Sequence, residues 1–199
     1  MGLFNVYHGG ETVMIPQGGL KYRLRTRSDS NHNFVLGAVG NLEGSYGETV
    51  LQDMRIADLD HTVWVAVEAS PPRPRMFHLR LTTSSTIFLS WADSGQLFML
   101  SLGNAPDSLS RDSSLFYFQD SDPVAWMNDP NKQTPSGDGW QKIRRIWTGH
   151  WDDAHPDDGL AQALDLAGGN LTHGAAVIAF RNVGGAPNQD WWVEYMGAT

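Results

Sequence analysis

The chain contains no cysteine among its 199 residues, and this absence excludes several kinds of chemistry. Without thiols there is no disulfide, no thiolate ligand for zinc and no cysteine nucleophile. No apolar run approaches the roughly 20 residues that span a bilayer as a helix. Residues 1–10 lack the basic region and apolar core of a secretory signal. We therefore expect a cytoplasmic protein without membrane insertion, which would need a non-classical route for any secretion.

Positive charge is also scarce. The 14 Lys and Arg residues are outnumbered by 22 Asp and Glu residues, which gives a formal net charge of −8. A surface of this sign repels polyanions, so neither a nucleic acid nor an anionic membrane is expected as a partner. The sequence also has no Gly-x-Ser-x-Gly elbow and no His-Glu-x-x-His motif. We expect a protein that is not an enzyme, with no catalytic residues and no cofactor.

A cluster of two His and four Asp residues between positions 149 and 159 is the one candidate for metal binding. Its spacing fits neither a zinc site nor a calcium loop. We therefore interpret this acidic loop as solvated surface beside a binding site, and no metal is expected.

What the sequence does contain is apolar and glycine-rich. Hydrophobic residues make up 41% of the chain, with 21 Gly and 8 Trp, which is typical of a globular domain with many tight turns. No window shows a sustained helical period, and the apolar runs are short and bounded by Gly, Pro, Asn or Asp. This pattern predicts an all-β protein. The expected strands are residues 20–26, 33–39, 48–54, 62–69, 75–81, 86–91, 96–102, 113–119, 140–148, 161–166, 175–181 and 191–195.

The expected strands fall into three groups of four, which begin near Leu20, Arg75 and Trp140. A weak threefold repeat follows, with units at about 19–70, 75–128 and 139–199 in a single domain. One unit cannot bury its own apolar face, but three can close a small barrel capped by hairpins. The register of the second unit stays open, because its closing aromatic is either Phe116 or Trp126.

The third unit carries the most chemistry in the shortest space. It contains Leu164-Asp165-Leu166, a glycine turn at Gly168, an apolar run that ends at Phe180, and Asn188-Gln189-Asp190-Trp191. A carboxylate is a strong acceptor for hydroxyl groups, and an aromatic ring covers the C–H face of a sugar. An amide supplies both a donor and an acceptor. These residue types together suit a neutral polyol.

This ordered set resembles the ricin-B-type β-trefoil lectins, a family that includes cytosolic lectins of fungi. The resemblance implies a β-trefoil fold and binding of galactose or N-acetylgalactosamine glycans. It implies that Asp165 accepts hydrogen bonds from two vicinal hydroxyls while Phe180 stacks on the ring. Asn188 would bond a further hydroxyl, and Gln189 would either shape the site or reach the sugar. Gly168, in the turn beside them, completes the expected carbohydrate-binding set.

The other two units lack this polar set, so one main site is expected. In the first unit, the positions of the carboxylate, the aromatic and the amide pair are assigned to Gly37, Asp53 and His61-Thr62. In the second unit the assignment depends on register. The carboxylate is replaced by Ser90 or Ser101, the amide pair by Pro123-Val124 in the later register, and the aromatic is kept, if at all, as Phe118.

Three of the site residues also have a purely structural interpretation. Asp165 would cap the glycine turn, Phe180 would point into the core, and Gln189 would bond the backbone. Trp64 and Trp191 are expected in the core, because buried aromatics usually serve packing.

Two functions of other kinds compete with lectin activity. β-Trefoils also inhibit proteases through exposed loops, here residues 120–139 and 149–159, and a trefoil can be the binding subunit of a toxin complex. For a lectin with one shallow site, a homodimer would supply avidity.

Overall fold

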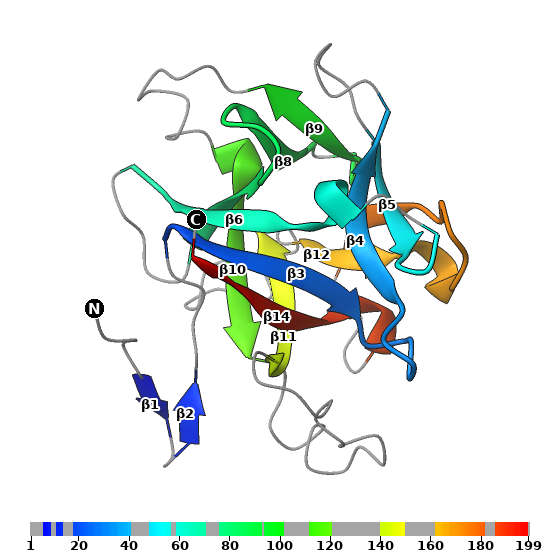
Figure 1. Cartoon of the computed structure of the whole chain (residues 1–199), viewed down its shortest axis with the longest axis horizontal. Helices are drawn as coiled ribbons and strands as arrows, with labels where there is room; N and C mark the ends of the chain where they lie inside the picture. Colours follow the sequence, from blue (N-terminus) through cyan, green and yellow to red (C-terminus); the bar gives the residue numbers. More distant parts are fainter. Residues whose placement is uncertain are drawn as a thin grey trace.

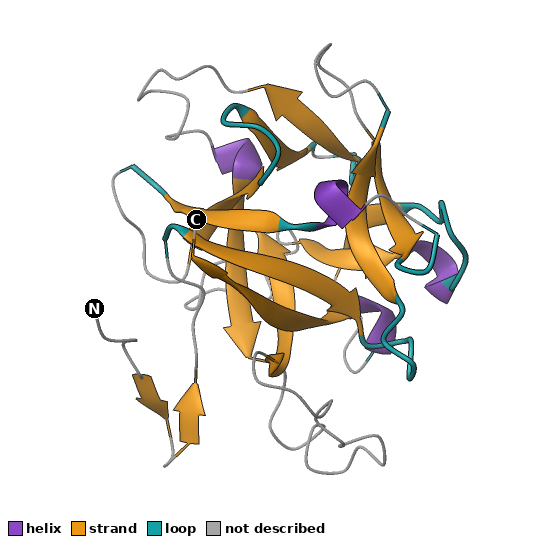
Figure 2. Cartoon of the chain, in the orientation of Figure 1, coloured by secondary structure: helices purple, strands orange, loops and turns teal. Residues whose placement is uncertain are grey.

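The structure is a computed structural model, and it describes residues 6–8, 11–13, 18–40, 48–56, 59–70, 76–92, 94–101, 112–120, 140–149, 162–181 and 186–198. Strands dominate these ranges and the helices are short 3-10 turns (Figure 2). Within the described ranges, no helix is long and apolar enough to cross a membrane.

Within the described ranges, twelve strands form the body of the protein, and each overlaps one of the twelve that the sequence predicts. They are β3 (Leu20–Thr26), β4 (Phe34–Val39), β5 (Glu48–Asp53), β6 (Trp64–Glu68), β7 (Met76–Leu81), β8 (Ile87–Trp91), β9 (Leu97–Ser101), β10 (Leu115–Asp120), β11 (Trp140–Thr148), β12 (Gln162–Leu166), β13 (Val177–Arg181) and β14 (Asp190–Ala198). A separate hairpin, β1 (Val6–His8) with β2 (Glu11–Val13), is not predicted by the sequence. The 3-10 helices are η1 (Leu59–Thr62), η3 (Asp112–Ser114), η4 (Ala167–Gly169) and η5 (Pro187–Gln189).

Six of the strands close into an antiparallel barrel (Figure 1). Going round the ring, β3 pairs with β6, β6 with β7 and β7 with β10. The ring continues from β10 to β11, from β11 to β14, and from β14 back to β3. Closure leaves no unpaired edge between these strands, so their backbone donors and acceptors are satisfied by neighbours.

The remaining six strands form three hairpins, β4–β5, β8–β9 and β12–β13. The hairpins touch one another: Glu48 of β5 pairs with Phe98 of β9, and Val50 of β5 forms a bridge with Ala176. The backbone N–H of Ala179 donates to the carbonyl of Gly95 at 2.8 Å, which joins the other pair. A six-stranded barrel with three mutually packed hairpins is a β-trefoil, as the sequence predicts.

The core repeats one arrangement in every unit. In the first unit, the indole Nε1 of Trp64 donates to the carbonyl of Leu36 at 3.2 Å. In the third unit, Trp191 donates to Leu164 at 3.1 Å. All four residues have no exposed surface, which confirms that both tryptophans belong to the core.

The second unit places Phe116 and Leu89 at the same points, and both are fully buried. Phe116 therefore closes this unit, and the register left open by the sequence is the earlier one. The alternative residue, Trp126, lies outside the described residues.

Contact between hairpins depends on a glycine. Gly95 has φ +85, and a methyl group added there would lie 2.5 Å from the carbonyl oxygen of Ala179. Gly174 has φ +82 but has nothing within 4 Å of the added methyl. Both substitutions carry the strain of a left-handed residue, which costs about 1–2 kcal/mol. Only Gly95→Ala also forces two hairpins apart.

We expect Gly95→Ala to lower the free energy of unfolding by at least ~1 kcal/mol more than Gly174→Ala, in the range of overpacked cores. Urea unfolding followed by tryptophan fluorescence measures the difference. Equal losses in the two variants would mean that the hairpin contact contributes nothing measurable.

Candidate functional site

The β12–β13 hairpin has one face in the core and one face turned away from it. Side chains of Leu164, Leu166, Val177 and Ala179 are buried in the core. Alternation puts the intervening residues on the opposite face, where Asp165 is paired with Ile178 and Ala163 with Phe180. The strand pattern therefore brings Asp165 and Phe180 to one face, with Ile178 between them.

The Asp165 carboxylate is held by two amides from η5. Asn188 donates from Nδ2 to Oδ1 at 2.9 Å, and Gln189 donates from Nε2 to Oδ2 at 2.8 Å. A carboxylate has about four acceptor positions, so about two stay available for hydroxyl donors. The site thus presents an oriented acceptor whose remaining lone pairs need partners.

The two amides differ in what they can still do. Gln189 is fully buried, and its Nε2 also donates to the carbonyl of Arg181 at 2.9 Å, so it braces the site from within. Asn188 is half-buried, and its Nδ2 also donates to the carbonyl of Leu166 at 3.4 Å. With both N–H groups of Asn188 engaged, its Oδ1 is the atom that remains for a ligand, as an acceptor.

Burial dominates the electrostatics of the carboxylate. Asp165 retains 4% exposure, and desolvation raises the pKa of its carboxyl above the ordinary value. Hydrogen bonds from Gln189 and Asn188, and the nearby charge of Arg145, act in the opposite direction on the same pKa. Burial is the largest of these effects. A further hydrogen-bond donor that reaches the carboxylate would therefore stabilise its charged form.

Phe180 is exposed, with 43% of its surface accessible, which rules out the core interpretation. The guanidinium carbon of Arg181 lies 5.9 Å from the centre of its ring, at the outer limit of a cation–π contact. Arg181 itself is exposed. The ring is thus an accessible apolar surface with a cation beside it.

Tight turns hold these elements in place. Gly168 and Gly169 adopt φ +63 and φ +67 inside η4, and the N–H of Ala167 bonds the carbonyl of Ala176 across the hairpin. Leu166 is the N-cap residue of η4 and makes no side-chain capping hydrogen bond. Both carboxylate oxygens of Asp165 accept from the η5 amides instead. Asp165 is therefore not the cap of this turn.

An ion-pair network anchors the strand that follows η5. Asp190 is buried, and its two carboxylate oxygens accept at 2.8 Å from Arg27 of the loop after β3 and from Arg145 of β11. Because Asp190 directly follows Gln189, these bonds fix where the η5 amides point.

The first unit has no carboxylate at the equivalent point, and its register corrects one assignment. Gly37 matches Asp165, but the residue that matches Phe180 is Gln52, because it pairs with Val35 as Phe180 pairs with Ala163. The sequence assignment to Asp53 was therefore wrong by one residue. The buried Gln52 donates to the carbonyl of Ala38 and fills the space that a side chain at Gly37 would need.

In the second unit Ser90, not Ser101, matches Asp165, since Leu89 and Ser90 pair with Met99 and Phe98. The hydroxyl of Ser90 is buried without a hydrogen-bond partner among the described residues. Ser113 and Ser114, which precede Phe116 by the same offsets as the η5 amides precede Trp191, replace the amide pair. The alternative pair, Pro123-Val124, lies outside the described residues.

Phe118 cannot supply an aromatic surface in the second unit. It is 4% exposed in the core, and its ring meets that of Phe77 edge to face.

Two residues of the Asp165 face were not predicted. Ile178 could have been found by counting two residues back from Phe180 along the strand. Arg181 could have been found only from its position next to Phe180. Among the described residues no group of three acidic or histidine side chains could hold a metal, and the acidic loop at 150–159 lies outside them.

Known structures agree with the fold. The chain is similar to the designed threefold-symmetric protein ThreeFoil, with TM-score 0.58, 17% identity, and coverage of 88% of this chain and 99% of that one. The BEL β-trefoil matches with TM-score 0.54 and 15% identity over 92% and 97% of the two chains. A mosquitocidal holotoxin matches with TM-score 0.62 and 12% identity, and the match covers 94% of this chain and 18% of the holotoxin chain. No protein-family model and no curated protein sequence matches.

Removal of the two amides should lower the free energy of unfolding by different amounts. Gln189→Ala leaves the Asp165 carboxylate and the Arg181 carbonyl short of a donor in buried surroundings, which costs about 1–3 kcal/mol. Asn188→Ala should cost less, because water reaches that half-buried side chain. Urea unfolding of both variants measures this, and an equal cost would contradict the bracing role of Gln189.

Proposed function

We propose that this protein is a carbohydrate-binding lectin whose main site is the Asp165 face of the third unit. The observation that carries the proposal is the doubly braced carboxylate beside an exposed aromatic ring. Carboxylate and aromatic come from adjacent strands, so their separation is fixed before a ligand arrives, which lowers the cost of binding. The β-trefoil fold and the likeness to ricin-B-type lectins in residues 163–192 support the same proposal.

The roles follow from the atoms that remain available. The free lone pairs of Asp165 accept from two vicinal hydroxyls of the sugar. Oδ1 of Asn188 accepts from a third, while Phe180 covers the C–H face of the ring. Gln189 holds the carboxylate and does not touch the ligand, and Gly168 shapes the turn beside it. The site offers more acceptors than donors, which suits a neutral polyol.

Within this class we propose galactose and N-acetylgalactosamine glycans as the ligands. An axial hydroxyl leaves a continuous C–H patch for an aromatic ring, and the family resemblance implies the same preference. A single site of this kind binds a monosaccharide with a Kd of about 1 mM, or roughly −4 kcal/mol. Useful avidity then requires a second site, through a homodimer or a larger assembly.

A binding subunit of a toxin is a second proposal. It rests on the likeness to one part of the mosquitocidal holotoxin chain. Co-purification of a larger partner chain would support it, and a protein that is isolated alone at all salt concentrations would contradict it.

Asp165→Ala tests the lectin proposal. We expect the variant to fold and to lose binding to galactosyl and N-acetylgalactosaminyl glycans by at least tenfold, since the strongest acceptor is gone. Glycan-array binding followed by calorimetry measures the loss. Asp53→Ala, in the first unit, is the matched control and should bind as the wild type does. If the wild type ignores every such glycan, the proposal is wrong.

Binding should also weaken in acid at an unusually high pH. Burial raises the pKa of the Asp165 carboxyl, so the carboxylate is lost at a pH above that of an ordinary aspartate, near 4. The folded state takes up this proton more readily than the unfolded state. The contribution of Asp165 to stability is therefore present below the unfolded pKa and lost as pH rises through the folded pKa.

Calorimetric titrations with lactose between pH 7 and pH 4, paired with carbon NMR of the Asp165 carboxyl, measure this effect. A midpoint at or below that of an ordinary aspartate would contradict it.

A further inference from the structure

A hollow lies on the barrel wall, away from the Asp165 face. It has a volume of about 510 Å³ and is lined by Gly18, Gly19, Val65, Val67, Glu68 and Arg80. Val65 and Val67 alternate with the core residues Trp64 and Ala66, so they face outward from β6. Arg80 pairs with Val65 across β6 and β7 and shares that outer face. The hollow therefore has an apolar floor with a guanidinium at its side.

Arg80 forms no ion pair among the described residues, unlike Arg23, whose Nε also lacks a partner but whose terminal nitrogen pairs with Glu194. The Nε of Arg80 is buried and has no hydrogen-bond partner among the described residues, and the side chain is half-buried. By contrast, Arg25 and Arg145 each bond a carboxylate at 2.8 Å. A half-buried guanidinium without an anionic partner is costly, and an oxyanion that accepts two parallel hydrogen bonds from its terminal nitrogens would offset that cost.

A second cation lies nearby. Lys21 of β3 pairs with Val65 from the other side, so Lys21, Val65 and Arg80 form one row across three strands. Neither cation has a carboxylate partner among the described residues. In a chain with a net charge of −8, Lys21 and Arg80 lie one on each side of Val65 and form no ion pair among the described residues, which makes this row locally positive.

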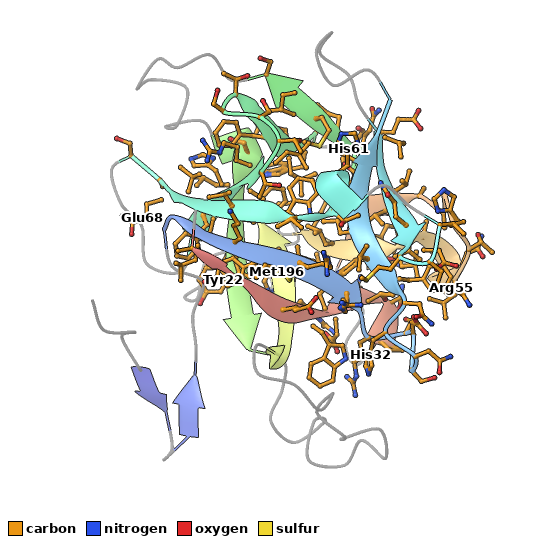
Figure 3. The ribbon with its side chains drawn as sticks, viewed as in Figure 1. Tyr22, His32, Arg55, His61, Glu68 and Met196 are labelled. Atoms are coloured by element: carbon orange, nitrogen blue, oxygen red, sulfur yellow. The ribbon has the colours of Figure 1, made fainter. Side chains whose placement is uncertain are left out.

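The lining also contains a hydrogen-bond acceptor. Glu68 is exposed at the end of β6 (Figure 3). Its side chain lies against the backbone of Gly18, where an added methyl group would meet its Cγ at 2.8 Å. A carboxylate there repels an anion but accepts from hydroxyls, so a ligand would place its charge towards Arg80 and its hydroxyls towards Glu68.

From this arrangement we infer a second binding site, for a small polar molecule that carries a carboxylate or sulfate group. Arg80 bonds the oxyanion through its two terminal nitrogens, and Lys21, paired with Val65 on the neighbouring strand, adds charge. Of the two valines, Val67 is the more exposed and supports the apolar face of the molecule. An acidic monosaccharide combines these features in one ligand, and a free inorganic oxyanion supplies only the first.

The second site is separate from the Asp165 face. In Figure 3 Glu68 lies at the left of the molecule, whereas η4 and η5, coloured orange and red in Figure 1, lie at the right. The inference therefore does not rest on the lectin proposal, and one can fail without the other.

The test is titration of ¹⁵N-labelled protein with glucuronate, glucose and inorganic sulfate at low salt, followed by backbone amide shifts. We expect glucuronate to shift the amides of Gly19, Val65 and Val67. Arg80→Gln should weaken this binding at least tenfold. Arg181→Gln, which removes an exposed arginine at the other site, is the matched control and should have no effect. Asp165→Ala should also leave it unchanged.

Glu68→Gln distinguishes loss of the site from loss of the fold. Removal of a like charge should tighten glucuronate binding, and a damaged fold cannot produce a gain. Binding of glucuronate but not glucose supports a site for an acidic sugar, and equal binding of sulfate supports a site for the free oxyanion. Binding that survives Arg80→Gln, or no shift with either anion, would overturn the inference.

Discussion

Closure of the six-stranded barrel is the constraint on which the rest of the structure depends. Once β14 pairs with β3, no edge remains in the ring, and the three hairpins must meet over one end. The bulky residues of each unit, Trp64, Phe116 and Trp191, then share one core with the leucines they pack against. Because this packing fixes the inner faces, the outer faces are free to differ between units without loss of the fold.

The Asp165 face uses that freedom at a cost in stability. A carboxylate with 4% exposure is unfavourable unless it is bonded, and here two amides and the charge of Arg145 oppose the effect of burial without cancelling it. The amides are held because Asp190, the next residue, is tied to Arg27 and Arg145. In the first unit the same point holds glycine, and Gln52 closes the space. A braced polar cluster in the third unit and a packing contact in the first unit thus occupy equivalent positions.

Much of this was predictable from local pattern. The pattern of apolar residues predicted all twelve strands of the body. The sequence from Leu164 to Trp191 predicted which residues form the polar face of the third unit. The hairpin β1–β2 was missed because its short strands have no apolar alternation. The position of Phe180 was assigned to Asp53 in place of Gln52. Neighbouring strand residues face opposite sides of the sheet, and only the register of the hairpin shows which of the two is equivalent to Phe180.

The sequence by itself determined the strands, the threefold repeat and the residue types of the Asp165 face, since these depend on periodicity of two and on spacing within one unit. Only the tertiary structure decided that Phe116 closes the second unit, that Phe180 is exposed and that Gln189 is buried. It alone brought Gly18, Glu68 and Arg80 around one hollow. These outcomes depend on pairing between units far apart in sequence, which is fixed when the barrel closes and leaves no trace in local composition.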